Sequence, residues 1–399
     1  MPYADSVQTA EKYASFYPEC QKEVLADDHY SQLTLKNSSR FSNAAVEEGN
    51  RVVALEFNAK GTYLAYSRED GSLNLWKIKS DRTQTYSVVR EVHGVGRKIH
   101  SISWHPGTHF ILATVGGTSQ VNIWDASTGV LVKNIGMPTE ATNLKCCYDV
   151  NGKWLGVLSS SGDFYMFDAD ENYELASVSK LSSASVGSED EVTALCWSPD
   201  SKQLFTGHRS GKIGIFAVSE SGLKELLLTS GHTAAVNCLR IDSQNRFLVA
   251  GGDDAVCSIW NTSNMCCEMV ISDFDTPIID MDLSRDAFVL ALCSETQTRI
   301  YSISSGACIF QLDQNNRVDD QKFRFYPEKM SFLTIAENEC VAKYYVPKAT
   351  EPPSQKEWAE ADKKKKPSRK LGKLGNQSSG RRDDDPPRRG RFPKRPLRR

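Results

Sequence analysis

Large aromatic side chains recur along this chain at a nearly constant spacing. They end short apolar runs such as SLNLW, QVNIW and VCSIW, and the successive steps between them are 48, 43, 49, 44, 41 and 44 residues. The residues that mark this period are Trp76, Trp124, Phe167, Phe216, Trp260, Tyr301 and Tyr345. A fixed period of about 20 to 50 residues is typical of repeated supersecondary units that bury their apolar faces by stacking on one another.

A second series of apolar runs leads each unit and keeps the same period. Its runs end at Phe57, Trp104, Tyr148, Trp197, Ile241, Leu283 and Phe325, in steps of 47, 44, 49, 44, 42 and 42 residues. Two independent markers therefore agree on a period close to the ~40–45 residues of a WD-repeat propeller blade.

Each unit contains short runs of alternating apolar residues separated by turn residues. Residues 236–261 read VNCLRID, SQNR, FLVAGG, DD and AVCSIWN, a pattern that predicts three strands and two turns. We therefore predict an all-β chain with a single seven-bladed WD40 β-propeller over residues 31–347. The last unit lacks a clear fourth strand, so we expect the segment around Ser31–Leu35 to supply it and close the ring. Residues 1–30 are left as an N-terminal arm.

Two polar residues fit structural positions of this repeat. His232 lies in a Gly-His pair ahead of a strand, and Asp254 lies six residues before the aromatic marker Trp260. An aspartate there can accept hydrogen bonds from the backbone of a tight turn. The match to the repeat is degenerate, because Trp124–Asp125 is the one literal Trp-Asp pair at a marker position. We interpret His232 and Asp254 as residues that stabilise a blade and not as catalytic groups.

Charge divides the chain into an acidic body and a basic tail. Residues 354–399 carry 17 Lys and Arg against 6 Asp and Glu, which leaves a net charge of −13 on residues 1–353. Residues 348–399 contain few aliphatic side chains, so we predict a disordered tail. Arg and Lys pair with phosphates, and the candidate RNA-binding residues are Lys363, Lys364, Lys365, Lys366, Arg369, Lys370, Arg381, Arg382, Arg388, Arg389, Arg391, Lys394, Arg395, Arg398 and Arg399. A nuclear-import signal and a merely solubilising tail are the alternatives.

Other classes of function find little support in the sequence. No apolar run is long enough to span a membrane, and the N-terminus does not read as a secretory signal. The 11 cysteines include no CxxC pair, which favours free thiols in a reducing compartment. The chain shows no phosphate-binding glycine loop, nucleophile elbow or metal-ligand cluster, so we expect no enzyme activity, no cofactor and no metal. The histidines without metal-ligand spacing, expected at strand ends or in loops, are His93, His100, His105, His109 and His208.

Several longer strings carry a more specific likeness. YLAYSREDGSLNLW, CCYDVNGKWLGV, LCWSPDSKQLFTGHRSGKIGIF, FLVAGGDDAVCSIWN and MCCEMVISDF occur in this order. Over about residues 50–345 the chain resembles the WD-repeat subunit of the THO complex, and the yeast form above all. That resemblance implies a non-enzymatic, nuclear scaffold subunit of the THO/TREX complex. It further implies a coupling of transcription elongation to mRNA packaging and nuclear export.

The same resemblance implies partners. The propeller would bind the other THO subunits, and it would reach the RNA helicase and the export adaptor of TREX indirectly. RNA would contact the tail. The alternative is a generic WD-repeat adaptor in another nuclear assembly, such as a chromatin complex or a ubiquitin-ligase receptor. The polybasic tail favours the first hypothesis, because a ligase receptor does not need it.

Overall fold

The computed structural model of the protein describes residues 50–78, 98–181, 190–285, 287–312 and 322–327 with their side chains. It gives four further strands as backbone alone, at 33–40, 86–92, 332–335 and 341–347. The chain divides into two compact units, Met1–Lys348 and Ala349–Arg399, and every described residue belongs to the first.

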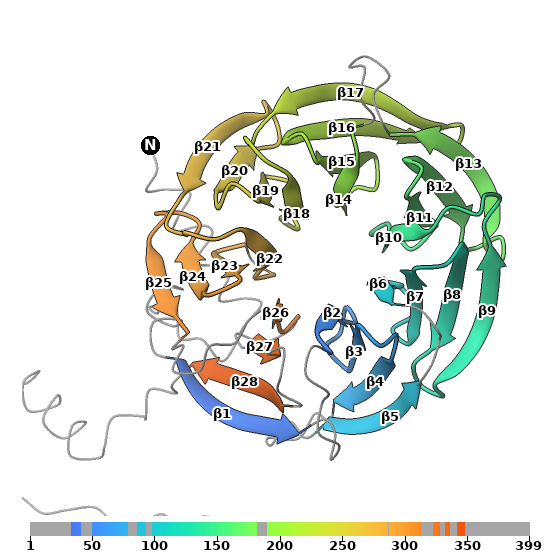
Figure 1. Ribbon diagram of the computed structural model, residues 1–399, viewed down its shortest axis with the longest axis horizontal. Coiled ribbons are helices and arrows are strands. Elements are labelled where there is room, and N and C mark those ends of the chain that lie inside the picture. The colour runs from blue at the N-terminus through green and yellow to red at the C-terminus, as the bar shows by residue number, and fades with distance from the viewer. Residues whose placement is uncertain are drawn as a thin grey trace, which may run out of the picture. The chain divides into compact units, whose positions relative to one another are not determined.

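The described strands pair into seven four-stranded sheets arranged around a central opening (Figure 1). Six of these sheets each use four consecutive strands. They are β2–β5 (Val52–Phe57, Tyr63–Arg68, Leu73–Ile78, Tyr86–Val92), β6–β9 (Ile99–Trp104, Ile111–Gly116, Gln120–Asp125, Val130–Gly136), β10–β13 (Asn143–Tyr148, Trp154–Ser159, Asp163–Asp168, Glu174–Lys180), β14–β17 (Val192–Trp197, Gln203–His208, Lys212–Ser219, Gly222–Ser230), β18–β21 (Val236–Ile241, Phe247–Gly252, Cys257–Asn261, Cys266–Ile271) and β22–β25 (Ile278–Leu283, Val289–Ser294, Thr298–Ser302, Cys308–Gln311). The prediction of an all-β propeller is confirmed.

The remaining sheet combines the two ends of the first unit. It contains β26 (Lys322–Phe325), β27 (Phe332–Ile335), β28 (Val341–Pro347) and, as its outermost strand, β1 (Leu33–Arg40). Strand β1 runs antiparallel to β28, with Leu33 opposite Pro347 and Arg40 opposite Val341, as the neighbouring blue and red strands of Figure 1 show. The predicted strand around Ser31–Leu35 therefore falls at the start of β1.

The apolar core lies between neighbouring sheets. One cluster joins Leu73 and Leu75 of the first sheet to Trp104 and Leu112 of the next, and equivalent clusters follow around the ring. At the junction of β26 with the first sheet, Tyr326 packs with Phe57 and other buried residues of that sheet. Burial of a large side chain contributes about 1.5–3 kcal/mol, so each sheet is stabilised chiefly by its two neighbours.

The inner strands share a local irregularity that decides which side chains face the centre. The register shifts near the start of six of them, for example between Val52 and Ala54 and between Asn143 and Lys145. In β2, β6 and β10 the first, fourth and sixth residues are buried, and the second, third and fifth are partly exposed. A bulge of this kind turns a side chain that simple alternation would place on the other face.

The fourth strand of each sheet lies at the rim and has a weaker sequence signal. Strands β9, β13 and β21 are mostly exposed, with Val132 58%, Val178 50% and Val270 57% exposed. The sequence pattern of residues 236–261 predicted three strands, and the structure adds β21 after them. An outer strand is exposed on much of its surface, so it lacks the apolar alternation of a half-buried strand.

Candidate binding site in the central channel

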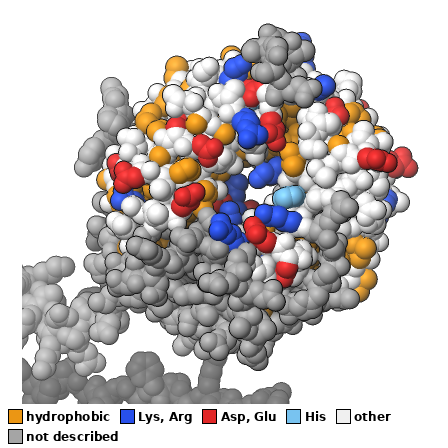
Figure 2. Space-filling model, in the orientation of Figure 1, with side chains coloured by type: hydrophobic (Ala, Val, Ile, Leu, Met, Phe, Trp, Pro, Cys, Tyr) orange, Lys and Arg blue, Asp and Glu red, His pale blue; other side chains and the backbone are white. Residues whose placement is uncertain are grey.

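The centre of the ring encloses a cavity of about 450 Å³ to which all seven inner strands contribute. Its lining combines small side chains, such as Ala54, Ser101 and Ala194, with a set of charged ones. Figure 2 shows Lys, Arg and His side chains around this central opening, with acidic side chains beside them. The charged lining residues are Glu56, Lys145, Arg240, Asp280, Lys322 and Arg324.

Two arginines bind the carboxylates of this channel. Arg324 on β26 lies 2.7 Å from Asp280 Oδ2 and 2.9 Å from Glu56 Oε1. Arg240 on β18 lies 3.4 Å from Glu56 Oε1 and 3.6 Å from Asp282 Oδ1. These contacts link β18, β22, β26 and β2, so the network bridges the junction at which the last sheet meets the first.

The network changes the acidity of its members in opposite directions. Burial would raise the pKa of Asp280, but Arg324 and the neighbouring Lys322 and Arg240 hold it below its usual value. Burial raises the pKa of Asp282 to about 6, although Arg324 and Arg240 oppose that effect. Burial disfavours the charge of Arg324, yet Asp280, Glu56 and Asp282 keep its pKa well above the ordinary value. Asp280 and Arg324 therefore remain charged, and Asp282 titrates within a physiological range.

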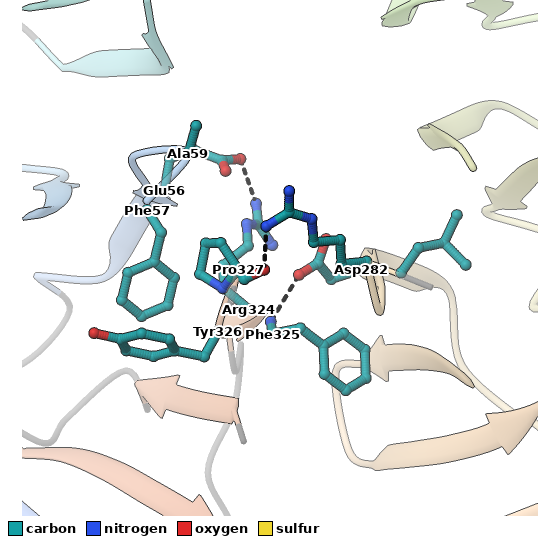
Figure 3. Close-up of a pocket in the computed structure, with 10 residues that line it drawn as sticks. Glu56, Phe57, Ala59, Asp282, Arg324, Phe325, Tyr326 and Pro327 are labelled. Carbon is teal, nitrogen blue, oxygen red and sulfur yellow. Dashed lines mark hydrogen bonds and ion pairs between the residues drawn. The ribbon is translucent and has the colours of Figure 1, made fainter. Parts of the chain in front are cut away.

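A second cavity of about 360 Å³ opens at this junction (Figure 3). It shares Glu56, Phe57, Ala59 and Arg324 with the channel. The ring of Tyr326 lies 5.0 Å from that of Phe57, and its hydroxyl donates a hydrogen bond to the carbonyl of Gly61. Gly61 has φ +62°, and a Cβ at this position would lie 2.6 Å from Tyr326, so only glycine allows this close contact.

The sequence markers lie away from the channel. Trp76, Trp124, Phe167, Phe216, Trp260 and Tyr301 all occupy third strands and are at most 7% exposed. Tyr345 is part of β28, and its side chain lies outside the described residues. The aromatic positions are thus buried between sheets, where a large packing surface is needed.

His232 and Asp254 meet in the sheet β18–β21. The Nδ1 of His232 lies 3.0 Å from Asp254 Oδ1, and its Nε2 lies 2.7 Å from Ser258 Oγ. Trp260 Nε1 donates to the same hydroxyl at 2.7 Å. A carboxylate acceptor at Nδ1 favours the tautomer with its proton there, so Nε2 accepts from Ser258. Ser258 was not predicted from the sequence, where its only signal is its position two residues before the aromatic marker Trp260.

Asp254 also shapes the turn that precedes β20. Its carboxylate accepts hydrogen bonds from the backbone nitrogens of Thr233, at 3.0 Å, and Val256, at 3.2 Å. Burial would raise its pKa, but the hydrogen bonds from His232 and Thr233 lower it. The expected role in a tight turn agrees with this geometry.

The other histidines fall in three kinds of place. His105 and His109 lie in the turn after β6, and His93 lies outside the described residues. The expectation of a strand end holds for His208, the last residue of β15, which is 1% exposed and has its Nε2 2.9 Å from Thr206 Oγ1. It is wrong for His100, which lies inside β6 and lines the channel, because the bulge turns this second residue inward.

Within the described ranges, no group of three or more His, Cys, Asp and Glu side chains could hold a metal ion. No described helix is long and apolar enough to cross a membrane. The candidate RNA-binding residues from Lys363 to Arg399 all lie outside the described residues.

Comparison with known proteins agrees with the fold and the repeat. The WD domain, G-beta repeat model matches residues 178–216 and 224–261. The chain is 25% identical over 330 residues to Protein TEX1 of Saccharomyces cerevisiae, which covers 81% of this chain and 78% of that protein. The chain is therefore similar to WD-repeat proteins of the TEX1/THO type. THO complex subunit 3 of Arabidopsis thaliana is 22% identical to this WD-repeat chain over 263 residues, 66% of this chain and 79% of that subunit.

A solved structure supports the architecture of the WD-repeat unit. The β-propeller domain of Cps50 (Swd1) from Myceliophteria thermophila superposes with a TM-score of 0.64 and covers 79% of this chain and 100% of that domain. The two sequences are 15% identical, so the likeness concerns the fold alone.

Proposed function

We propose that this WD-repeat protein is a nuclear scaffold subunit of a THO/TREX-type complex that couples transcription elongation to mRNA packaging and nuclear export. The observation that carries the proposal is the similarity to TEX1 over 330 residues, together with the similarity to THO complex subunit 3. Both stretches are long enough to include most of the propeller.

The two parts of the chain would have different partners. Residues 1–353 carry a net charge of −13, which repels nucleic acid, and we assign the binding of the other THO subunits to the propeller. The RNA helicase and the export adaptor would be reached through those subunits. The basic residues from Lys363 to Arg399 would bind RNA without strong sequence preference, because they neutralise phosphates.

Affinity purification of the full chain, followed by mass spectrometry, tests the assembly. We expect the other THO subunits to be recovered both with the full chain and with residues 1–353. Recovery of a chromatin complex or a ubiquitin ligase in their place would favour the generic adaptor. Loss of the THO subunits on tail removal would contradict the division between propeller and tail.

Binding of single-stranded RNA at several salt concentrations tests the tail. If about five phosphates are contacted, the logarithm of the affinity should fall against the logarithm of the salt concentration with a slope near −3.5. Replacement of the Lys and Arg residues of 354–399 by Ser should abolish this binding. A tailless propeller fused to a foreign import signal separates RNA binding from import, and full rescue of mRNA export by that fusion would leave the tail as an import signal.

We further propose that the seventh sheet completes a closed ring of seven blades in solution. Its support is the antiparallel pairing of β1 with β28 over Leu33–Arg40 and the contact of Tyr326 with the first sheet. A propeller that closes in this way leaves only short strand edges exposed.

A further inference from the structure

The positive charge in the channel exceeds what its carboxylates neutralise. Glu56, Asp280 and Asp282 are all engaged by Arg240 and Arg324. Among the residues that the structure describes, the side chains of Lys145 on β10 and Lys322 on β26 have no partner in an ion pair or hydrogen bond. The Nε of Arg324 is buried and likewise has no acceptor there.

Lys145 and Lys322 occupy the same level of the channel. Each lies three residues before the last residue of its inner strand, which is Tyr148 in β10 and Phe325 in β26. The equivalent residues on the other five inner strands are the small Ala54, Ser101, Ala194 and Cys238 and the acidic Asp280, which Arg324 binds, and all five line the cavity. Both lysines line the cavity, and apart from Asp280 the side chains at their level on those strands are small.

Burial lowers the pKa of Lys145, and the nearby cations Lys322 and Arg240 lower it further, although Asp280 opposes them. Lys145 and Lys322 thus repel each other within the channel. An anion between them would relieve that repulsion and would form charge-assisted hydrogen bonds with both.

We propose that Lys145 and Lys322 form a site in the central channel for an acidic side chain, Asp or Glu, of an extended peptide segment from a protein partner. The small and apolar lining, which includes Val53, Leu195 and Ile279, suits a peptide. A volume of about 450 Å³ is within the usual range for a ligand pocket. A nucleic acid fits less well, because the acidic body around the channel repels a polyanion. This site does not depend on which assembly the protein joins.

Binding of a defined peptide to the purified full-length protein tests the proposal. A fluorescent hexapeptide, Gly-Ser-Glu-Glu-Ser-Gly, would be compared by anisotropy with the same peptide carrying Gln in place of both Glu residues. We expect the Glu peptide alone to bind, and we expect Lys145→Gln and Lys322→Gln each to weaken it about tenfold, the loss of one charge-assisted contact. Lys224→Gln, at an exposed position on the rim strand β17, is the matched control and should leave binding unchanged.

The thermal midpoints of these variants provide a second measurement. Because the two lysines repel each other, Lys145→Gln should leave the midpoint unchanged or raise it. A lower midpoint would show that Lys145 stabilises the fold and would count against a site held ready for an anion.

Other outcomes would overturn the proposal. Equal binding of the Glu and Gln peptides, or binding that persists in both lysine variants, would remove the acidic side chain as the ligand. Stabilisation by inorganic phosphate without binding of either peptide would indicate a free anion. Loss of single-stranded RNA binding in Lys145→Gln would assign the channel to nucleic acid.

In the assembled complex, carbodiimide coupling should join Lys145 or Lys322 to a partner carboxylate, and the absence of such a crosslink would contradict the proposal.

Discussion

The sheet β18–β21 and the junction of β26 with β2 are stabilised by polar groups of different origin. In the sheet, His232 bonds Asp254 and Ser258, which lie 22 and 26 residues further along the chain. At the junction, Arg324 bonds Glu56 across 268 residues. The first set stabilises one repeat and forms within it, whereas the second stabilises the ring and forms only when its two ends meet. Local contacts close short loops at little entropic cost, and the distant contact must follow a much larger loss of entropy.

The two regions are similarly buried, with His232 and Arg324 each 8% exposed, but they differ in charge. In the sheet, each hydrogen bond joins two neutral groups or one charged group and a neutral one. Trp260 also donates to Ser258 there. At the junction, Arg324 is 8% and Asp280 is 6% exposed, so each buried charge is stabilised by the other. Removal of one partner from a buried ion pair is costlier than removal of a neutral hydrogen bond. The junction should therefore be the more sensitive of the two regions, which four experiments can test.

Deletion of residues 1–40 should give the largest loss. It removes β1 and leaves β28 with an unpaired edge in a three-stranded sheet. We expect the thermal midpoint to fall by more than about 10 °C, or the protein to fail to fold. Deletion of residues 1–30 keeps β1 and is the control, which should melt like the full chain. Equal midpoints for both truncations would show that β1 does not close the ring.

Substitution of Arg324 by Met should have the next largest effect. Met approximates the length of the side chain but leaves Asp280 and Glu56 without their cation, at a cost of about 3–5 kcal/mol. Chemical denaturation would measure the change in the free energy of unfolding. The double variant with Asp280→Asn should recover part of the loss. A cost below that of Ser258→Ala would reverse the proposed ranking of the two regions.

The variant Ser258→Ala breaks the polar set within the sheet. It leaves the Nε2 of His232 and the indole nitrogen of Trp260 without the hydroxyl that both contact. We expect a loss of about 2 kcal/mol in the free energy of unfolding, typical of buried polar groups left without partners. Ser263→Ala, on the exposed turn after β20, is a suitable control and should change stability little. Unfolding that remains cooperative in Ser258→Ala would fit a purely local role.

The variant Asp282→Asn should give the smallest change and the opposite sign. The folded pKa of Asp282 is raised to about 6 from 3.8, so the folded state binds more protons between these values and stability from this group falls as pH rises. Above pH 6 the burial of the charged Asp282 lowers the free energy of unfolding by its full amount, at most about 3 kcal/mol. Asn keeps an acceptor for the backbone nitrogen of Phe325, which Asp282 Oδ2 contacts at 2.7 Å.

We therefore expect Asp282→Asn to raise the thermal midpoint by about 2–4 °C at pH 7.5 and by much less at pH 5. The difference between variant and parent is the quantity to follow, because titrations that the two proteins share cancel in it. A variant less stable than the parent at pH 7.5 would mean that the contact with Arg240 outweighs the cost of burial.

The sequence by itself determined the repeat and the residues that pack it. A period near 44 residues predicted the sheets, because a buried aromatic such as Trp124 or Trp260 is required once in each unit. His232 and Asp254 could be assigned structural roles from the sequence for the same reason, since both belong to one unit. The rim strands gave little signal, because exposed residues such as Val132 and Val270 follow no apolar alternation.

Only the tertiary structure decided what the centre of the ring contains. Glu56, Lys145, Asp280 and Arg324 lie far apart in the sequence and read there as ordinary polar positions of half-buried strands. The bulge near the start of the inner strands turns selected side chains to one axis, and closure of the ring brings Arg324 within ion-pair distance of Glu56 and Asp280. Which charges find a partner there depends on the order of the sheets around the axis, a property that no single repeat contains.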